Sequence, residues 1–261
     1  MQSSKWGNLG HGYGKPRRKV RISRYTEDVK TLGIVTILSV LSLGLVLEGC
    51  KEAASSAEPA APVAAAPVPD TTPPPPHDTR PVIVCFGDSL TAGYGTDPGQ
   101  SYPDALQRLL DTRGFHYRVV NEGISGNTTK DGLDRVNGVI AEHPKIVVLE
   151  FGGNDGLRGL PLEQTRSNLD AMVAQLKTSG TQVALAGITL PPDYGHDYIA
   201  QFNAMYTSLA HKYRVPLLPF LLKGVFGVPG DMQDDATHAT AKGNQQVAIN
   251  VERLIQPMLR R

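Results

Sequence analysis

The chain has 261 residues, which is enough for one medium-sized domain with additional segments. Residues 1–30 hold eight basic and two acidic side chains, whereas residues 51–261 hold 18 basic and 22 acidic ones. A mildly acidic body argues against nucleic acid as a partner. The two cysteines, Cys50 and Cys85, are too few for a disulfide scaffold or a cysteine-rich zinc site.

Residues 1–49 combine a basic leader with a hydrophobic segment. An uncharged, mostly apolar run from Thr31 to Leu47 follows the basic residues, and it ends in Leu47-Glu48-Gly49-Cys50. This order is typical of an export signal. The ending also resembles a bacterial lipobox, which predicts Cys50 as a lipidation site, although Glu48 departs from the usual small residue.

Two alternatives to a lipidated Cys50 remain open, an uncleaved helical anchor with its positive side in the cytoplasm and an ordinary cleaved signal. All three export the rest of the chain. We therefore expect a periplasmic or cell-surface protein that a lipid or a helix holds to a bacterial membrane.

Residues 50–80 are predicted to be a linker. Residues 51–80 contain eight alanines and eight prolines, a composition that favours extended backbone and cannot bury a core. At about 3.1 Å per residue such a segment reaches on the order of 90 Å. This length suits a tether that holds a domain away from a membrane.

The folded domain is expected at 81–261, where short apolar runs alternate with helical patterns. The expected strands are Val82–Phe86, Tyr117–Val120, Ile146–Phe151, Val183–Ile188 and Val215–Pro219. The expected helices are Tyr102–Leu110, Lys130–Glu142, Leu162–Ser179, Tyr198–Tyr213 and Ala241–Leu259. This alternation predicts an α/β sandwich around a parallel sheet, in which ligands bind beyond the carboxyl ends of the strands.

Candidate catalytic residues follow the expected strands or precede the last helix. Ser89 follows the first strand, and its hydroxyl needs a base before it can act as a nucleophile. His238 can be that base, and Asp235, three residues earlier, can orient it. The backbone N–H groups of Ser89 and Gly126 and the amide of Asn154 are candidate donors to an oxyanion.

Alone, each of these motifs has an ordinary structural explanation. Gly-Asp-Ser and Asn-Asp-Gly are common turn sequences, and a single histidine is often a surface residue. Their joint occurrence after successive strands favours a catalytic site. By contrast, no cluster of His, Cys or Asp has metal-ligand spacing, so neither a metal nor another cofactor is expected.

Gly87-Asp88-Ser89-Leu90, Gly126, Asn154 and Asp235-x-x-His238 resemble the conserved blocks of the GDSL, or SGNH, hydrolase family. The stretches 152–159, 190–195 and 232–235 are similar to its bacterial periplasmic thioesterase I/lysophospholipase/arylesterase branch. The likeness covers about residues 82–259.

This resemblance implies a flavodoxin-like three-layer α/β/α sandwich and a serine esterase or thioesterase. It implies a triad of Ser89, Asp235 and His238, an oxyanion hole of Ser89, Gly126 and Asn154, and no cofactor. By analogy, Leu157, Leu160, Pro191 and Tyr194 would bind the acyl group. Ala239 departs from the proline that usually follows the catalytic histidine, and we expect little effect because that proline stiffens a loop.

The expected substrates are small acyl esters or thioesters, with lysophospholipids among them. Two alternatives remain at this stage. One is an O-acetyl esterase acting on polysaccharide or cell wall, and the other is a non-catalytic tethered binding domain on the same fold.

Overall fold

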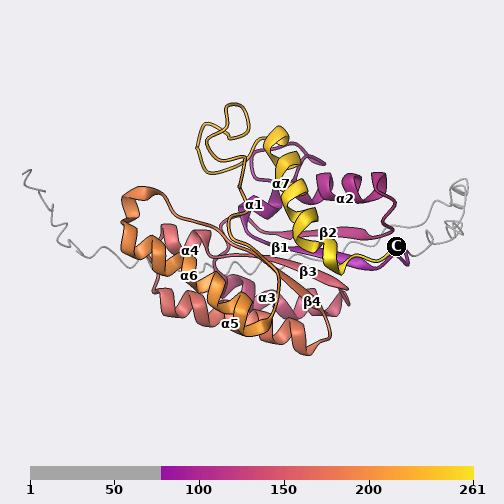
Figure 1. Cartoon of the computed structure of the whole chain (residues 1–261), viewed down its shortest axis with the longest axis horizontal. Coiled ribbons are helices and arrows are strands. Elements are labelled where there is room, and N and C mark those ends of the chain that lie inside the picture. The colour runs from indigo at the N-terminus through magenta and orange to yellow at the C-terminus, as the bar shows by residue number, and fades with distance from the viewer. Residues whose placement is uncertain (1–77) are drawn as a thin grey trace, which may run out of the picture. The chain divides into compact units, whose positions relative to one another are not determined.

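A computed structural model of the chain describes residues 78–261 (Figure 1). The expected leader and anchor at 1–49, Cys50 and all but the last three residues of the expected linker lie outside the described residues. The strands are β1 (Val82–Gly87), β2 (Arg118–Gly123), β3 (Ile146–Glu150), β4 (Gln182–Ala186) and β5 (Leu217–Leu218).

The strands form one parallel sheet in the order β2-β1-β3-β4-β5. The chain leaves β1 toward one edge to form β2, and then returns to the other side of β1 to form β3. The strand order therefore reverses between β1 and β3. In open α/β sheets this reversal opens a crevice at the carboxyl ends of the two strands, where ligands bind.

Helices cover both faces of the sheet (Figure 1). The helices are α1 (Ser89–Ala92), α2 (Tyr102–Thr112), α3 (Thr129–Ala141), α4 (Gly153–Leu157), α5 (Leu162–Thr178), α6 (His196–Tyr213) and α7 (Ala241–Ile255). Helices α2 and α7 pack on one face, and α3, α5 and α6 pack on the other. The α/β sandwich around a parallel sheet that the sequence pattern predicts is confirmed, and so are the three layers that the family resemblance implies.

Side chains of β1 alternate between the two hydrophobic cores. Ile83 and Cys85 join the core beneath α2 and α7, whereas Val84 and Phe86 join the core beneath α3, α5 and α6. All four are fully buried, which explains why the strand is a continuous apolar run. Burial also raises the pKa of the Cys85 thiol to about 12, so this cysteine is an unreactive core residue.

The expected elements are present with small shifts at their ends. The last helix ends at Ile255, and the chain continues as a 3-10 turn over Gln256–Met258, because Pro257 cannot supply the N–H that a longer α-helix needs. The short helices α1 and α4 were not predicted, since four or five residues carry no helical periodicity. Among residues 78–261, no helix has the length and apolarity needed to cross a bilayer.

Candidate active site

Ser89 is the first residue of α1 and lies directly beyond the carboxyl end of β1. Asp88 caps this helix, because its Oδ1 accepts a hydrogen bond of 3.0 Å from the Leu90 N–H. The N–H of Ser89 is one of the first amides of the helix, which have no acceptor within it. The cap therefore fixes a turn that presents the Ser89 hydroxyl and a free backbone donor together.

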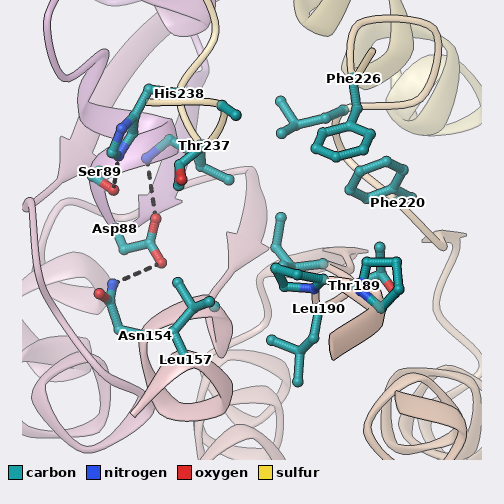
Figure 2. A pocket seen from close by; sticks show the side chains of 17 residues that line it. Asp88, Ser89, Asn154, Leu157, Thr189, Leu190, Phe220, Phe226, Thr237 and His238 are labelled. Atoms are coloured by element: carbon teal, nitrogen blue, oxygen red, sulfur yellow. Dashed lines mark hydrogen bonds between the residues drawn. The ribbon is translucent and has the colours of Figure 1, made fainter. Parts of the chain in front are cut away.

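His238 joins Ser89 to Asp235. Its Nε2 lies 2.8 Å from Oγ of Ser89 (Figure 2). Its Nδ1 lies 2.6 Å from Oδ2 of Asp235. If Nδ1 carries the proton and donates to the carboxylate, the lone pair of Nε2 faces the serine hydroxyl. The three side chains that the motifs singled out therefore form a continuous hydrogen-bonded relay.

The loop before α7 holds Asp235 in the orientation that the relay needs. Oδ1 of Asp235 accepts hydrogen bonds from the backbone N–H groups of Thr237 and His238, at 2.9 and 3.0 Å. Partial burial opposes ionisation of Asp235, but hydrogen bonds from the side chain and backbone of His238 and from the Thr237 N–H outweigh it and lower its pKa to about 2. Asp235 is therefore an anion at neutral pH.

Asn154 lies beside Asp88, the residue before Ser89, and Gly126 lies in the loop that follows β2. Asn154 Nδ2 donates to Asp88 Oδ2 at 3.1 Å and to the carbonyl oxygen of Asn127 at 3.0 Å. Both neighbours are acceptors if Asp88 is ionised, so the amide must turn its nitrogen toward them. Gly126 has a φ of +82°, a conformation that glycine adopts without strain, and its carbonyl accepts a hydrogen bond from Arg158.

A second carboxyl group lies beneath Asp88. Glu150, the last residue of β3, is fully buried, and its Oε2 accepts hydrogen bonds from Thr91 Oγ1 at 2.9 Å and from the Asp88 N–H at 3.3 Å. Burial, and then the charge of Asp88, raise the pKa of Glu150 well above its ordinary value. Burial also raises the pKa of Asp88 to about 6, against the opposing effects of the Leu90 N–H and His238.

An apolar cavity of about 360 Å³ opens beside the relay. Ser89, His238 and Asn154 lie at one end, and Phe220 and Phe226 lie at the other (Figure 2). The two phenylalanine rings pack edge to face with their centroids 6.1 Å apart. The cavity can hold an apolar chain whose polar end reaches the serine.

Two of the four expected acyl-binding residues, Leu157 and Pro191, line this cavity. Leu160 and Tyr194 lie outside its lining. Tyr194 instead donates a hydrogen bond of 2.8 Å to the carbonyl oxygen of Leu157 and so holds one wall in place. The 3-10 turn Pro192–Tyr194 brings the tyrosine to this position.

Several residues at the site were missed by the sequence analysis. Phe220 and Phe226 close the far end of the cavity, and the Tyr94 ring lies over His238 with centroids 4.7 Å apart. Glu150 stands at the end of an apolar strand, two residues before Gly152-Gly153-Asn154, and a charged residue at that position was a usable signal. No local pattern distinguishes the three aromatic residues from surface residues.

Comparison with known proteins places these features in a family. Residues 85–246 match the GDSL-like lipase/acylhydrolase family. Esterase TesA of Pseudomonas aeruginosa is 41% identical over 178 residues, which cover 68% of this chain and 89% of that relative. Thioesterase 1/protease 1/lysophospholipase L1 of Escherichia coli K12 is 35% identical over 178 residues, covering 68% of this chain and 84% of the relative.

Solved structures agree with this assignment. The crystal structure of TesA matches with a TM-score of 0.66 and 41% identity, over 68% of this chain and 99% of that one. AlinE4, an SGNH-hydrolase family esterase, matches with a TM-score of 0.58 and 37% identity, over 70% of this chain and 98% of the other.

Proposed function

The chain belongs to the GDSL-like lipase/acylhydrolase family and is a serine ester hydrolase, and from this premise we propose that Ser89 is its nucleophile, with His238 as the base and Asp235 as the group that orients the base. The observation that carries this proposal is the unbroken relay from Asp235 through His238 to Ser89 at the end of an apolar cavity.

In the acylation step, Ser89 Oγ attacks the carbonyl carbon of the ester while His238 Nε2 takes its proton. The negatively charged Asp235 stabilises the imidazolium that forms. His238 then returns the proton to the departing alcohol or thiol. The C–O or C–S bond breaks, and the acyl group remains on Ser89.

In the deacylation step, water replaces the alcohol. His238 takes a proton from the water as its oxygen attacks the acyl carbon, and the Ser89 oxygen leaves with the proton from Nε2. The products are a carboxylic acid and the original enzyme. Ser89 and His238 are the two residues that exchange a proton in these steps, and Asp235 stays ionised throughout.

Both steps pass through a tetrahedral species with a negatively charged oxygen. We assign its donors as the Ser89 N–H, the Gly126 N–H and the Asn154 amide. Asn154 Nδ2 donates to Asp88 and to the carbonyl oxygen of Asn127. One of these two bonds has to be shared with the oxyanion.

The acyl group enters the apolar cavity, whose wall includes Leu157 and Pro191. The lining favours aliphatic acyl groups longer than acetyl, since each buried CH₂ contributes about 0.8 kcal/mol. This argues for small acyl esters and thioesters, lysophospholipids included, over O-acetyl groups of polysaccharides. A series of p-nitrophenyl esters and acyl-CoAs of graded chain length tests this point. A steep fall in kcat/KM beyond the acetyl ester would favour the acetyl esterase.

The domain is proposed to work outside the cytoplasm, tethered through residues 1–80. The support is the order of basic leader, apolar run, Cys50 and proline-rich stretch in the sequence. Mass spectrometry of the mature N-terminus tests it. A diacylglyceryl group on Cys50 would establish a lipoprotein, whereas an N-terminus that begins at Met1 would indicate an uncleaved helical anchor.

A further inference from the structure

Arg135 of α3 is a half-buried arginine that takes no part in the proposed relay, and its side chain is 20% exposed. Its Nη2 donates to the carbonyl oxygens of Gly87 and Glu122, each at 2.9 Å, and its Nε donates to Asn127 Oδ1 at 2.9 Å. One guanidinium thus binds the ends of β1 and β2 and the loop that follows β2.

Two aromatic rings hold the guanidinium in this position. Its Cζ atom lies 4.4 Å from the ring centroid of Phe86 and 5.6 Å from that of Phe151. The rings themselves pack edge to face, with centroids 4.9 Å apart. Arginine is suited to this contact because its flat cation stacks on rings while its edge donates hydrogen bonds.

Two partners of Arg135, Gly87 and Asn127, lead to the three proposed oxyanion donors. Gly87 lies two residues before Ser89 and also accepts a hydrogen bond from the Ile124 N–H at 3.1 Å. Asn127 follows Gly126, and its carbonyl oxygen accepts the Asn154 amide at 3.0 Å. All three proposed donors are therefore within two residues, or one hydrogen bond, of a group that Arg135 holds.

We propose that Arg135 is a positioning residue that fixes the three donors of the oxyanion hole relative to one another. This inference rests on the proposed function, because it assumes that those donors serve a tetrahedral adduct on Ser89. Its physical basis is that oxyanion stabilisation depends on donors held in place before the reaction. Loosening the guanidinium contacts weakens binding of the tetrahedral species while the apolar cavity, lined by other residues, keeps its affinity for the acyl chain.

The test uses two variants of the full chain. Arg135→Lys keeps the positive charge but loses the planar guanidinium with its several N–H donors. Arg135→Met removes both the charge and the donors. Arg113→Met is the matched control, since Arg113 pairs with the buried Glu252 at 2.7 Å and neither residue lines the cavity. We expect its loss to lower stability and to leave the inhibition constants unchanged. Three quantities are compared: kcat and KM for a p-nitrophenyl ester, inhibition by a phenylboronic acid, and inhibition by 1-octanol.

The boronic acid reports the oxyanion hole directly. A bond forms between Ser89 Oγ and boron, the hydroxyl proton moves to His238, and no other bond breaks, so the adduct is tetrahedral like the reaction intermediate. Octanol reports only the apolar cavity. We expect Arg135→Lys to lower kcat and to weaken boronate inhibition by about 10- to 100-fold, with KM and octanol inhibition within about twofold of wild type.

Three outcomes would count against the account. Boronate inhibition of Arg135→Lys within about twofold of wild type would overturn the role of Arg135. If inhibition by octanol and inhibition by boronate were weakened equally, the role of Arg135 would also be overturned, because the cavity itself would then have collapsed. If wild-type protein bound no boronate at Ser89, the proposed nucleophile would fail and the inference with it. Because Arg135→Lys retains the cation, it serves as the test even if Arg135→Met does not fold.

Discussion

Asn154 Nδ2 donates a 3.1 Å hydrogen bond to Oδ2 of Asp88, the residue that directly precedes Ser89. This bond joins the element that follows β3 to the element that follows β1, across the point where the strand order reverses. Because β1 and β3 are neighbours in the sheet, the segments that follow them lie side by side, and the Asn154 amide lies next to the residue before Ser89.

Replacing Asn154 by alanine removes one proposed oxyanion donor while leaving the relay intact. Loss of one such donor typically lowers kcat by about 100- to 1,000-fold. We expect a fall of this size with a small change in KM, measured with a p-nitrophenyl ester. A fall in kcat/KM caused by KM alone would instead show that Asn154 binds the ground state.

Asp235→Asn tests the orienting carboxylate. The amide cannot stabilise the imidazolium and favours the wrong tautomer, so we expect kcat to fall by about 100- to 10,000-fold. The pKa of Asp235 is lowered to about 2 in the fold, so its ionised form stabilises the protein above the ordinary pKa of 3.8, and this contribution disappears as the pH falls toward 2. Urea unfolding should therefore show wild type and variant converging in stability between pH 4 and pH 2, whereas a constant difference would contradict the assignment.

Glu150→Gln tests whether Glu150 is a neutral acid beneath Asp88. Its pKa is raised by burial and by Asp88, so the folded protein keeps a proton that the unfolded chain releases above its ordinary pKa of 4.5. The free energy of unfolding of the wild type should then decrease as pH rises above about 4.5. The free energy of unfolding of the non-ionisable variant should decrease less. Unfolding free energies at pH 5 and pH 8 measure the difference. Parallel stabilities for the two proteins would show that Glu150 is not held neutral.

Leu157→Ser tests the wall of the cavity. Leu157 is 42% exposed, so a bound acyl chain can bury a further part of its side chain. This burial contributes about 1 kcal/mol to the binding free energy of the acyl chain. We expect kcat/KM to fall about fivefold for an octanoyl ester and to stay unchanged for an acetyl ester. Val228→Ser is the control, because Val228 is similarly exposed at 37% but does not line the cavity. Equal effects of both variants would place the acyl chain elsewhere.

The sequence predicted the fold well because the strands β1, β3 and β4 are buried along nearly their whole length. Runs such as Val82–Phe86 are apolar throughout, and the helices between them are long enough to show an apolar stripe. The positions of Ser89, Asn154 and His238 followed from motifs of the family, and the structure brings Ser89 and His238 into hydrogen-bond contact although 149 residues separate them.

Other features depend on three-dimensional contacts that no local pattern encodes. Phe220 and Phe226, from the segment between β5 and α7, line the same cavity as Leu157 of α4. Leu160 lies outside this lining although it is only three residues from Leu157. Arg135 looks like an ordinary helix residue in the sequence. Its role follows from three acceptors that come from three separate segments.

The central claim is that Ser89 is the nucleophile, and labelling with a fluorophosphonate tests it most directly. Wild-type protein should gain one phosphonyl group on the peptide that contains Ser89, and Ser89→Ala should take no label and lose ester hydrolysis while keeping its unfolding temperature. Wild-type protein that remains unlabelled at Ser89, or a Ser89→Ala variant that still hydrolyses esters, would contradict the account.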